Sequence, residues 1–199
     1  MPPLYDDNKS ELSSARGLAV AFRRTVLADA IRIIFGAPFS LKFRYLYCTG
    51  RWPKVSRPER FTEKILHRLL CTNDPRFAPL SDKVTVRDYV SSRVGHDVLI
   101  PLLGVFEQIT PADILALNER VLVLKNNHDC GSASIVDTDE DDLDAVCQRL
   151  NANTHKVYGR NFNEYWYQDI APRIMAERFI GDEDRMPPAD YRFNVFNQG

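Results

Sequence analysis

The spacing of apolar residues predicts an amphipathic helix between Gly17 and Gly36. Apolar side chains recur there every three or four positions, namely at Leu18, Phe22, Val26, Ala30, Ile33 and Ile34. Charged residues interrupt the same segment, namely Arg23, Arg24, Asp29 and Arg32, and they are too costly for the centre of a bilayer. We therefore predict a helix that packs on the domain. The arginines favour an alternative, in which this helix lies at a membrane surface as a peripheral anchor.

Two capping signals predict the next helices. Thr62 is predicted to cap a helix over Glu63 to Leu70. Ser81 is predicted to cap another helix over Asp82 to Val94, and Gly95 supplies its end. Both segments carry apolar residues among charged ones, as expected of helices that pack one side on a domain.

Short apolar runs bounded by proline, glycine or polar residues predict strands. The first is Val98 to Leu103, an edge strand because a proline interrupts it. The others are Val121 to Lys125, Ile135 with Val136, Pro172 to Ile180 and Asp190 to Phe196. Short helices are predicted over Pro111 to Leu117 and Asp141 to Leu150. This succession predicts an α+β (α/β) fold.

Composition fits a soluble globular protein. The 199 residues are 44% hydrophobic and 27% charged, as expected of one domain or of a domain with an appendage. We expect a polar, disordered tail over residues 1–16 and a helical, basic and aromatic lead segment over residues 17–58. The main domain is expected over residues 59–199.

Charge and cysteine usage narrow the possible partners and the compartment. The net charge of −1 gives no general attraction to polyanions, so we expect no nucleic-acid partner. The four cysteines, Cys48, Cys71, Cys130 and Cys147, lie far apart in the sequence and form no closely spaced pair. Free thiols in a reducing cytosol are the simplest account, so we expect a cytoplasmic protein, with the inner face of the membrane as the alternative location.

The segment Val121 to Val136 carries the most informative chemistry. An apolar strand ends there in Lys125, and a polar loop of amides, small hydroxyls and one glycine follows over Asn126 to Ser134. Few bulky side chains would keep an anion from the backbone N–H groups of such a loop, and the lysine supplies a point charge for a phosphate. The pattern indicates a nucleotide-phosphate clamp on a β-hairpin. Its spacing is neither a Walker loop nor a dinucleotide fingerprint, so an ordinary hairpin with a solvated lysine is the alternative.

The acidic run Asp137 to Asp144 is not predicted to bind metal. It lacks the glycine turn and the terminal glutamate of a calcium loop. Carboxylates at the N-terminus of the following helix explain it better, because the helix dipole favours negative charge there.

Several motifs in order carry a family resemblance. They are RFTEKI at residues 60–65, SDKVTVRDYV at 81–90, IPLLGVF at 100–106, VLKNNHDCGSASIV at 123–136, PRIMAERFI at 172–180 and DYRFNVFNQG at 190–199. This succession resembles the TupA-like branch of the ATP-grasp superfamily, which is associated with bacterial teichuronopeptide and surface-polysaccharide synthesis. The resemblance runs from about Pro58 to the last residue. It implies an ATP-grasp-type fold, here with an N-terminal helical region and an incomplete antiparallel sheet lobe that binds nucleotide.

The resemblance also implies an activity. ATP-grasp enzymes phosphorylate a carboxylate with ATP and Mg²⁺, and an amine then attacks the acyl phosphate. A carboxylate–amine ligase acting on an acidic or amino-acid-bearing glycan substrate is therefore expected. Such chemistry depends on positioning and on neutralising the charge of the transferred phosphoryl group.

Roles for individual residues follow from the same resemblance. Lys125 matches the strand lysine that contacts phosphates, and residues 128–134 match the mobile glycine-rich loop above them. Glu177 to Ile180 match the hinge that meets adenine. Arg192, in an acidic-x-basic pair of the next strand, would clamp a phosphate or an acidic substrate, and we expect it to be catalytic together with Lys125. The implied ATP-binding set is Lys125, His128, Gly131, Ser132, Ser134, Glu177, Arg178, Phe179, Ile180 and Asp190.

Two departures from the family pattern give two alternatives. Asp129 stands where the family loop has glycine, and its negative charge is expected to weaken nucleotide binding. The family's Mg²⁺ ligands lie on strands beyond Gly199, so a chain truncated at its C-terminus is expected. The first alternative is a non-catalytic remnant that binds nucleotide or serves in protein interaction. The second is a glycosyltransferase-like protein of a glycan pathway.

Overall fold

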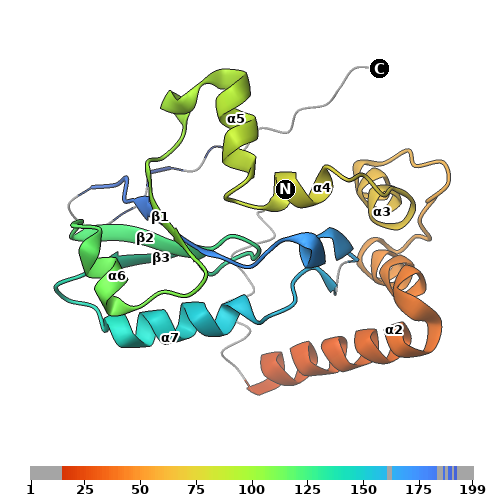
Figure 1. The fold of residues 1–199 in the computed structure, drawn as a ribbon. Coiled ribbons are helices and arrows are strands. Elements are labelled where there is room, and N and C mark those ends of the chain that lie inside the picture. The colour runs from red at the N-terminus through yellow and green to blue at the C-terminus, as the bar shows by residue number, and fades with distance from the viewer. Residues whose placement is uncertain (1–14, 161–162, 183–185, 187, 190, 192–199) are drawn as a thin grey trace. The chain divides into compact units, whose positions relative to one another are not determined.

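The computed structural model describes residues 15–160, 163–182, 186, 188–189 and 191 of the chain (Figure 1). These residues form two compact units. A helical unit comprises residues 1–74 and 159–165, and a sheet unit comprises residues 75–158 and 166–199. Most of the expected tail over residues 1–16 and of the expected strand over residues 190–196 lies outside the described residues.

The helical unit begins with α2 (Ala15–Thr49), which bends at Gly36. Gly36 has φ 81°, a backbone conformation that glycine adopts without strain, and Pro38 follows it with no N–H to donate. The helix predicted over residues 17–36 is confirmed, and so is helix in the middle of residues 35–58. Among the described residues, no helix combines the length and the apolar content needed to cross a membrane.

The second helix of this unit, α3 (Phe61–Cys71), begins one residue before the predicted cap, Thr62. The predicted helix is present, but the predicted cap is wrong, because Arg60 is the N-cap residue and Thr62 lies inside the helix. Glu63 accepts from the backbone N–H groups of Lys54 (3.2 Å), Glu59 (3.0 Å) and Arg60 (3.1 Å), and these bonds lower the pKa of its carboxyl. Farther along the helix, a small core forms where Leu66 packs against Leu41 and Tyr45 of α2.

The sheet unit is built on four antiparallel strands in the order β1-β4-β2-β3. They are β1 (Leu102–Phe106), β2 (Val121–Asn126), β3 (Ser134–Asp137) and β4 (Ile174–Arg178). The mixed α+β fold is confirmed, and so is a strand at the sheet edge, but the bounds predicted for it are wrong. The 3-10 turn η1 occupies His96–Val98, and β1 begins only at Leu102. The strand predicted over residues 172–180 is present as β4, and its first four residues are all buried. A strand buried on both faces has covering elements on both sides.

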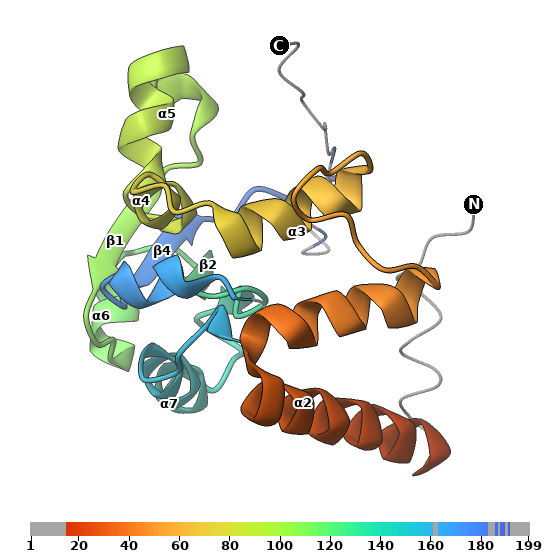
Figure 2. The same ribbon diagram turned by 90° about the vertical axis from the view of Figure 1, so that its right-hand side faces the viewer.

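Helices on both faces supply that cover. They are α4 (Phe77–Ser81), α5 (Val86–Val94), α6 (Pro111–Ala116) and α7 (Leu143–Thr154), with short 3-10 turns η1 (His96–Val98) and η3 (Tyr165–Asp169). Figures 1 and 2 show α5 and α7 on opposite sides of the sheet. The main core lies on the α7 side and includes Ile109, Ile114, Leu122, Leu124, Val136, Cys147, Leu150, Ile174 and Ala176.

The helix predicted over residues 82–94 is wrong in its first part. Ser81 ends α4 instead of capping a new helix, and α5 begins only at Val86. The break occurs at Asp82, whose carboxylate accepts from the backbone N–H of Val84 at 2.8 Å. The end at Gly95 is confirmed, with φ 93°.

Candidate functional site

The end of β2 places Lys125 on the face of the sheet opposite to the main core. Leu122, Leu124 and Asn126 alternate with it and are fully buried. Across the strand pair, Val123 lies opposite Glu177 of β4, which makes Lys125 and Glu177 diagonal neighbours on one face. The Lys125 ammonium donates to Glu177 Oε2 at 2.5 Å. Two residues that the resemblance assigns to nucleotide binding therefore meet in the structure.

A second cation, Arg87 of α5, approaches the same carboxylate. Its Nη1 donates to Glu177 Oε1 at 3.0 Å, and its Nη2 donates to the carbonyl of Ile100. The side chains of Glu177, Arg87 and Lys125 are 6, 15 and 21% exposed, so this Glu177 cluster is largely removed from water. One carboxylate neutralises only one of two cations. The cluster therefore carries a net positive charge that favours an anion such as phosphate.

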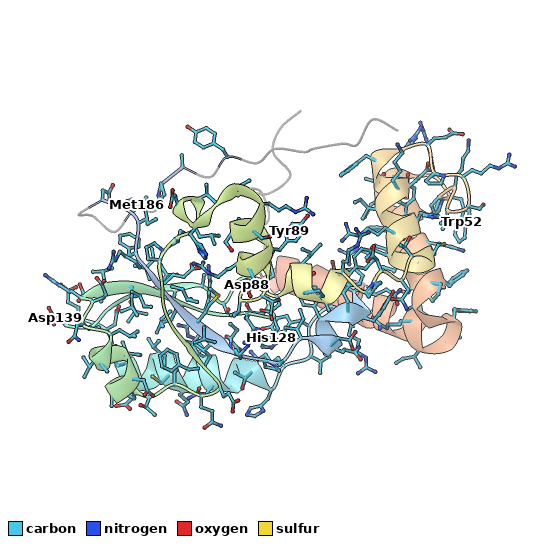
Figure 3. All side chains as sticks on the ribbon, turned by 45° about the horizontal axis from the view of Figure 1, so that its top comes forward. Trp52, Asp88, Tyr89, His128, Asp139 and Met186 are labelled. Carbon is cyan, nitrogen blue, oxygen red and sulfur yellow. The ribbon has the colours of Figure 1, made fainter. Side chains whose placement is uncertain are left out.

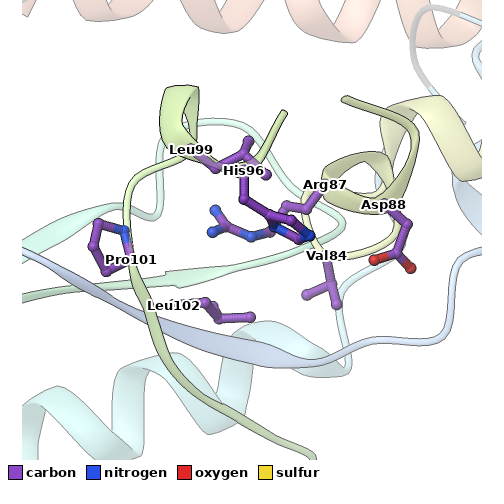
Figure 4. A pocket seen from close by; sticks show the side chains of 7 residues that line it. All are labelled: Val84, Arg87, Asp88, His96, Leu99, Pro101 and Leu102. Atoms are coloured by element: carbon purple, nitrogen blue, oxygen red, sulfur yellow. The ribbon is translucent and has the colours of Figure 1, made fainter. Parts of the chain in front are cut away.

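A pocket of about 450 Å³ opens beside this cluster (Figure 4). Its lining combines four apolar residues with three charged or titratable ones and comprises Val84, Arg87, Asp88, His96, Leu99, Pro101 and Leu102. Arg87 belongs to both the pocket and the Glu177 cluster. A ligand in the pocket would thus lie beside the excess positive charge.

The loop between β2 and β3 is closed on itself. Ser132 Oγ accepts from the backbone N–H of Asn126 at 3.0 Å and donates to Asp129 Oδ1 at 2.6 Å. Lys83 donates to the carbonyl of Asn126 at 2.7 Å, to the carbonyl of Asp129 and to Asp129 Oδ1 at 3.2 Å. The side chain of Asp129 is 1% exposed, so its charge is held inside the loop and balanced by Lys83.

The start of the loop is fixed by Asn127, which is fully buried. Its Nδ2 donates to Asp82 Oδ1 (2.9 Å) and to the carbonyl of Ala171 (3.0 Å), while its Oδ1 accepts from the backbone N–H of Arg173 (2.6 Å). Arg173 in turn pairs with Asp82 at 3.0 Å. This network joins the segments before α5, after β2 and before β4, so the loop has a rigid base.

His128 (labelled in Figure 3) is buried in the same loop. Its ring meets the ring of Tyr158 edge to face at 5.2 Å, and its Nδ1 lies 3.3 Å from Asn127 Oδ1. Burial lowers the pKa of the His128 imidazole, against the opposing effect of Asp129. Burial, with the Asp129 carboxylate, raises the pKa of the Tyr158 hydroxyl. Both side chains are therefore neutral at neutral pH.

The exposed part of the loop is short. Gly131 has φ 93°, and its α-carbon faces open space, so its backbone is accessible to a ligand. Ser134, at the start of β3, accepts from Arg149 Nη2 at 2.7 Å. Of the loop residues in the predicted nucleotide-binding set, Gly131 and Ser134 thus lie nearer the surface than His128 and Ser132.

The hinge residues after Glu177 are more exposed. Arg178 is 54% exposed and pairs with Glu119 at 2.8 Å, and Ile180 is 48% exposed. Phe179 is half-buried. Asp190 and Arg192 lie outside the described residues. Nucleotide contacts of these residues stay predictions.

Three charged residues escaped the sequence analysis, namely Arg87, Lys83 and Arg173. Each pairs with a residue at least 46 positions away, so spacing along the chain gives no signal. A weak signal did exist, because Lys83 and Arg87 both fall in the motif at residues 81–90 that carries part of the resemblance.

Possible metal ligands lie scattered among the described residues. No group of three or more histidine, cysteine, aspartate or glutamate side chains lies close enough there to hold a metal ion. We therefore assign no Mg²⁺ ligand to these residues.

Comparison with known proteins identifies the family. A family model described as TupA-like ATPgrasp matches residues 63–199, which is more than half of the chain. No curated protein and no solved structure matches the chain significantly. The match includes the Glu177 cluster, the loop after β2 and the motif that contains Lys83. The chain therefore belongs to the TupA-like ATP-grasp family.

Proposed function

We propose that this protein takes part in an ATP-dependent carboxylate–amine ligation in bacterial surface-polysaccharide or teichuronopeptide synthesis. The observation that carries the proposal is the Glu177 cluster, in which two cations share one carboxylate beside a pocket and at the base of a closed loop. Family membership supports ATP as the nucleotide. An acidic or amino-acid-bearing glycan is the substrate class, and the inner face of the membrane is the proposed location.

The reaction would proceed in two steps. A carboxylate oxygen of the substrate attacks the γ-phosphorus of ATP and ADP leaves, which gives an acyl phosphate. An amine then attacks the acyl carbon and inorganic phosphate leaves. The part proposed for Lys125 and Arg87 is to hold the negatively charged phosphates in a site with little water, where electrostatic stabilisation is strongest.

The loop residues would have separate tasks. The α-carbon of Gly131 faces open space, and the backbone N–H groups next to it would donate to phosphate oxygens. Lys83, Asp129 and Ser132 would keep the loop in the shape that presents those groups. Asp129 then acts as an internal brace, and its paired charge does not oppose the phosphates.

A non-catalytic nucleotide-binding role is the alternative. The inward-facing side chains of His128 and Ser132 favour it, because they leave few polar side chains on the outer surface of the loop. The two proposals predict the same nucleotide binding. They differ in whether ADP and phosphate form when a carboxylate and an amine are supplied.

Calorimetric titration of the full chain with a non-hydrolysable ATP analogue tests the proposal. Lys125→Ala should weaken binding by roughly tenfold or more, since one charge-assisted contact contributes about 1.5–3 kcal/mol. Lys156→Ala, at an exposed lysine of the same unit, is the matched control and should bind as the wild type does. Equal affinity of Lys125→Ala and the control would refute the phosphate-binding assignment.

A further inference from the structure

The helical unit presents an apolar and aromatic surface on and after α2. Phe35 and Phe39 have ring centroids 5.0 Å apart, and Phe39 and Trp52 have centroids 6.0 Å apart. These rings are 60, 38 and 51% exposed. Ile33 and Ile34, which precede Phe35 in α2, are 84 and 70% exposed. Large side chains this exposed and this close together indicate a binding surface.

The core of the helical unit does not need these side chains. Beyond the bend, Leu41 and Tyr45 face Leu66 of α3 and are buried. Phe39 and Tyr47, each two residues from one of them, point elsewhere and are exposed. α2 therefore has one side that packs in its own unit and another that meets solvent.

Basic residues are frequent in the segment that carries these side chains. The segment 31–58 contains Arg32, Lys42, Arg44, Arg51, Lys54 and Arg57 and no acidic residue. The whole chain has a net charge of only −1, so the positive charge is concentrated here. Arg44, Arg51 and Arg57 are exposed, and Trp52 (labelled in Figure 3) is next to Arg51.

We propose that the aromatic cluster of Phe35, Phe39 and Trp52, with the exposed residues Ile33, Ile34, Arg51 and Arg57 of the same segment, binds the surface of an anionic lipid bilayer. Its charge is complementary to anionic headgroups. Tryptophan and phenylalanine beside arginine are suited to the headgroup boundary, where rings enter the apolar layer and guanidinium groups stay in water. The surface lies within the helical unit, and its binding does not depend on nucleotide or on the proposed reaction.

Vesicle flotation with the full chain tests the proposal. The chain should float with vesicles of phosphatidylcholine and phosphatidylglycerol, and raised salt should release it. Vesicles of phosphatidylcholine alone should retain much less protein. Floating of the chain with neither vesicle, or equally with both, would overturn the proposal.

Two matched variants locate the surface. Arg51→Glu with Arg57→Glu should weaken binding at least about fivefold per reversed cation. Arg93→Glu with Lys156→Glu makes the same change of net charge at exposed positions of the sheet unit and should leave binding unchanged. Equal loss in both double variants would mean that only net charge matters, and the assigned surface would be wrong.

Fluorescence gives an independent readout, since the chain has two tryptophans. Spin-labelled lipid in the anionic vesicles should quench Trp52, which is 51% exposed, and spare Trp166, which is 4% exposed. Trp52→Phe should therefore remove the quenching, and quenching that persists in this variant would refute the placement of Trp52 in lipid. A second copy of the chain is the alternative partner for this surface, and sedimentation in the absence of lipid tests it. If the chain self-associates, if Trp52→Ser abolishes this association and if the chain does not float with vesicles, the surface binds a second copy of the chain instead.

Discussion

Glu177→Gln is the most direct perturbation of the candidate site. The substitution keeps the volume of the side chain and removes the charge that Lys125 and Arg87 share. Two cations, 21 and 15% exposed, would then face each other without a counterion. Removing one partner of a buried pair costs about 3–5 kcal/mol, and a charge-assisted hydrogen bond contributes about 1.5–3 kcal/mol. Because the glutamine oxygen still accepts one bond and the cations are partly exposed, we expect a loss of about 2–4 kcal/mol in the free energy of unfolding.

The chain contains a matched control for this substitution. Glu119 pairs with Arg178 at 2.8 Å, close to the distances at Glu177, but the two side chains are 28 and 54% exposed. Solvent screens such a pair, so Glu119→Gln should lower the free energy of unfolding by less than about 1 kcal/mol. The difference between the losses of Glu177→Gln and Glu119→Gln measures the effect of burial, since the chemical change is the same at both positions.

Urea unfolding followed by tryptophan fluorescence measures both variants. A Trp52→Phe background leaves Trp166, which lies in the same unit as Glu177 and is buried. The signal then reports the sheet unit alone, and the two-state analysis applies to one cooperative unit. Equal losses for Glu177→Gln and Glu119→Gln would show that the cluster is screened by solvent. The reasoning that makes it a desolvated anion site would then fail.

Three further outcomes are expected. Burial lowers the pKa of His128 below its ordinary value of 6.5. Below about pH 6.5 the unfolded chain therefore binds a proton that the folded chain does not, and the free energy of unfolding should fall as the pH drops. His128→Phe should reduce this fall, as measured by urea titrations at several pH values. Gly131→Ala should cost about 1 kcal/mol through φ 93° alone, because nothing lies within 4 Å of the added carbon, whereas Cys130→Ala should be neutral in the same titration. Lys83→Met should lower the free energy of unfolding by about 3 kcal/mol, because it leaves the buried Asp129 unpaired, and adding Asp129→Asn should restore most of this loss. A double variant no more stable than Lys83→Met would contradict this pairing.

Elements with a local signal were predictable from the sequence. The β2–β3 hairpin shows short apolar runs on both sides of a polar loop, and the structure pairs Leu122 with Val136. α7 begins at an aspartate, Asp142, whose carboxylate accepts from the backbone N–H of Ala145 at 3.0 Å, as expected for an acidic run at a helix N-terminus. Such features depend on residues a few positions apart, so the sequence contains the information directly.

Features that depend on distant residues were not predictable. The Glu177 cluster needs Arg87, which lies 90 positions earlier on another element. The break before α5 arises because Asp82 bonds with Asn127 and Arg173, both far along the chain. Capping statistics describe only the nearest turn, so they placed the start of the helix at Asp82, where tertiary hydrogen bonds hold a turn and α5 begins only at Val86.

Asp129 shows why a charge in a binding loop cannot be interpreted from its position alone. By sequence it replaces a glycine beside the expected phosphates, and its charge was expected to repel them. In the structure its carboxylate points into the loop, where Lys83 and the hydroxyl of Ser132 bind it. A carboxylate in this position can stabilise a loop that has fewer glycines. Its hydrogen bonds hold a turn that glycine would otherwise make easier to form. Asp129 and Lys83 thus form one structural arrangement in this loop, and weaker nucleotide binding through Asp129 stays a prediction.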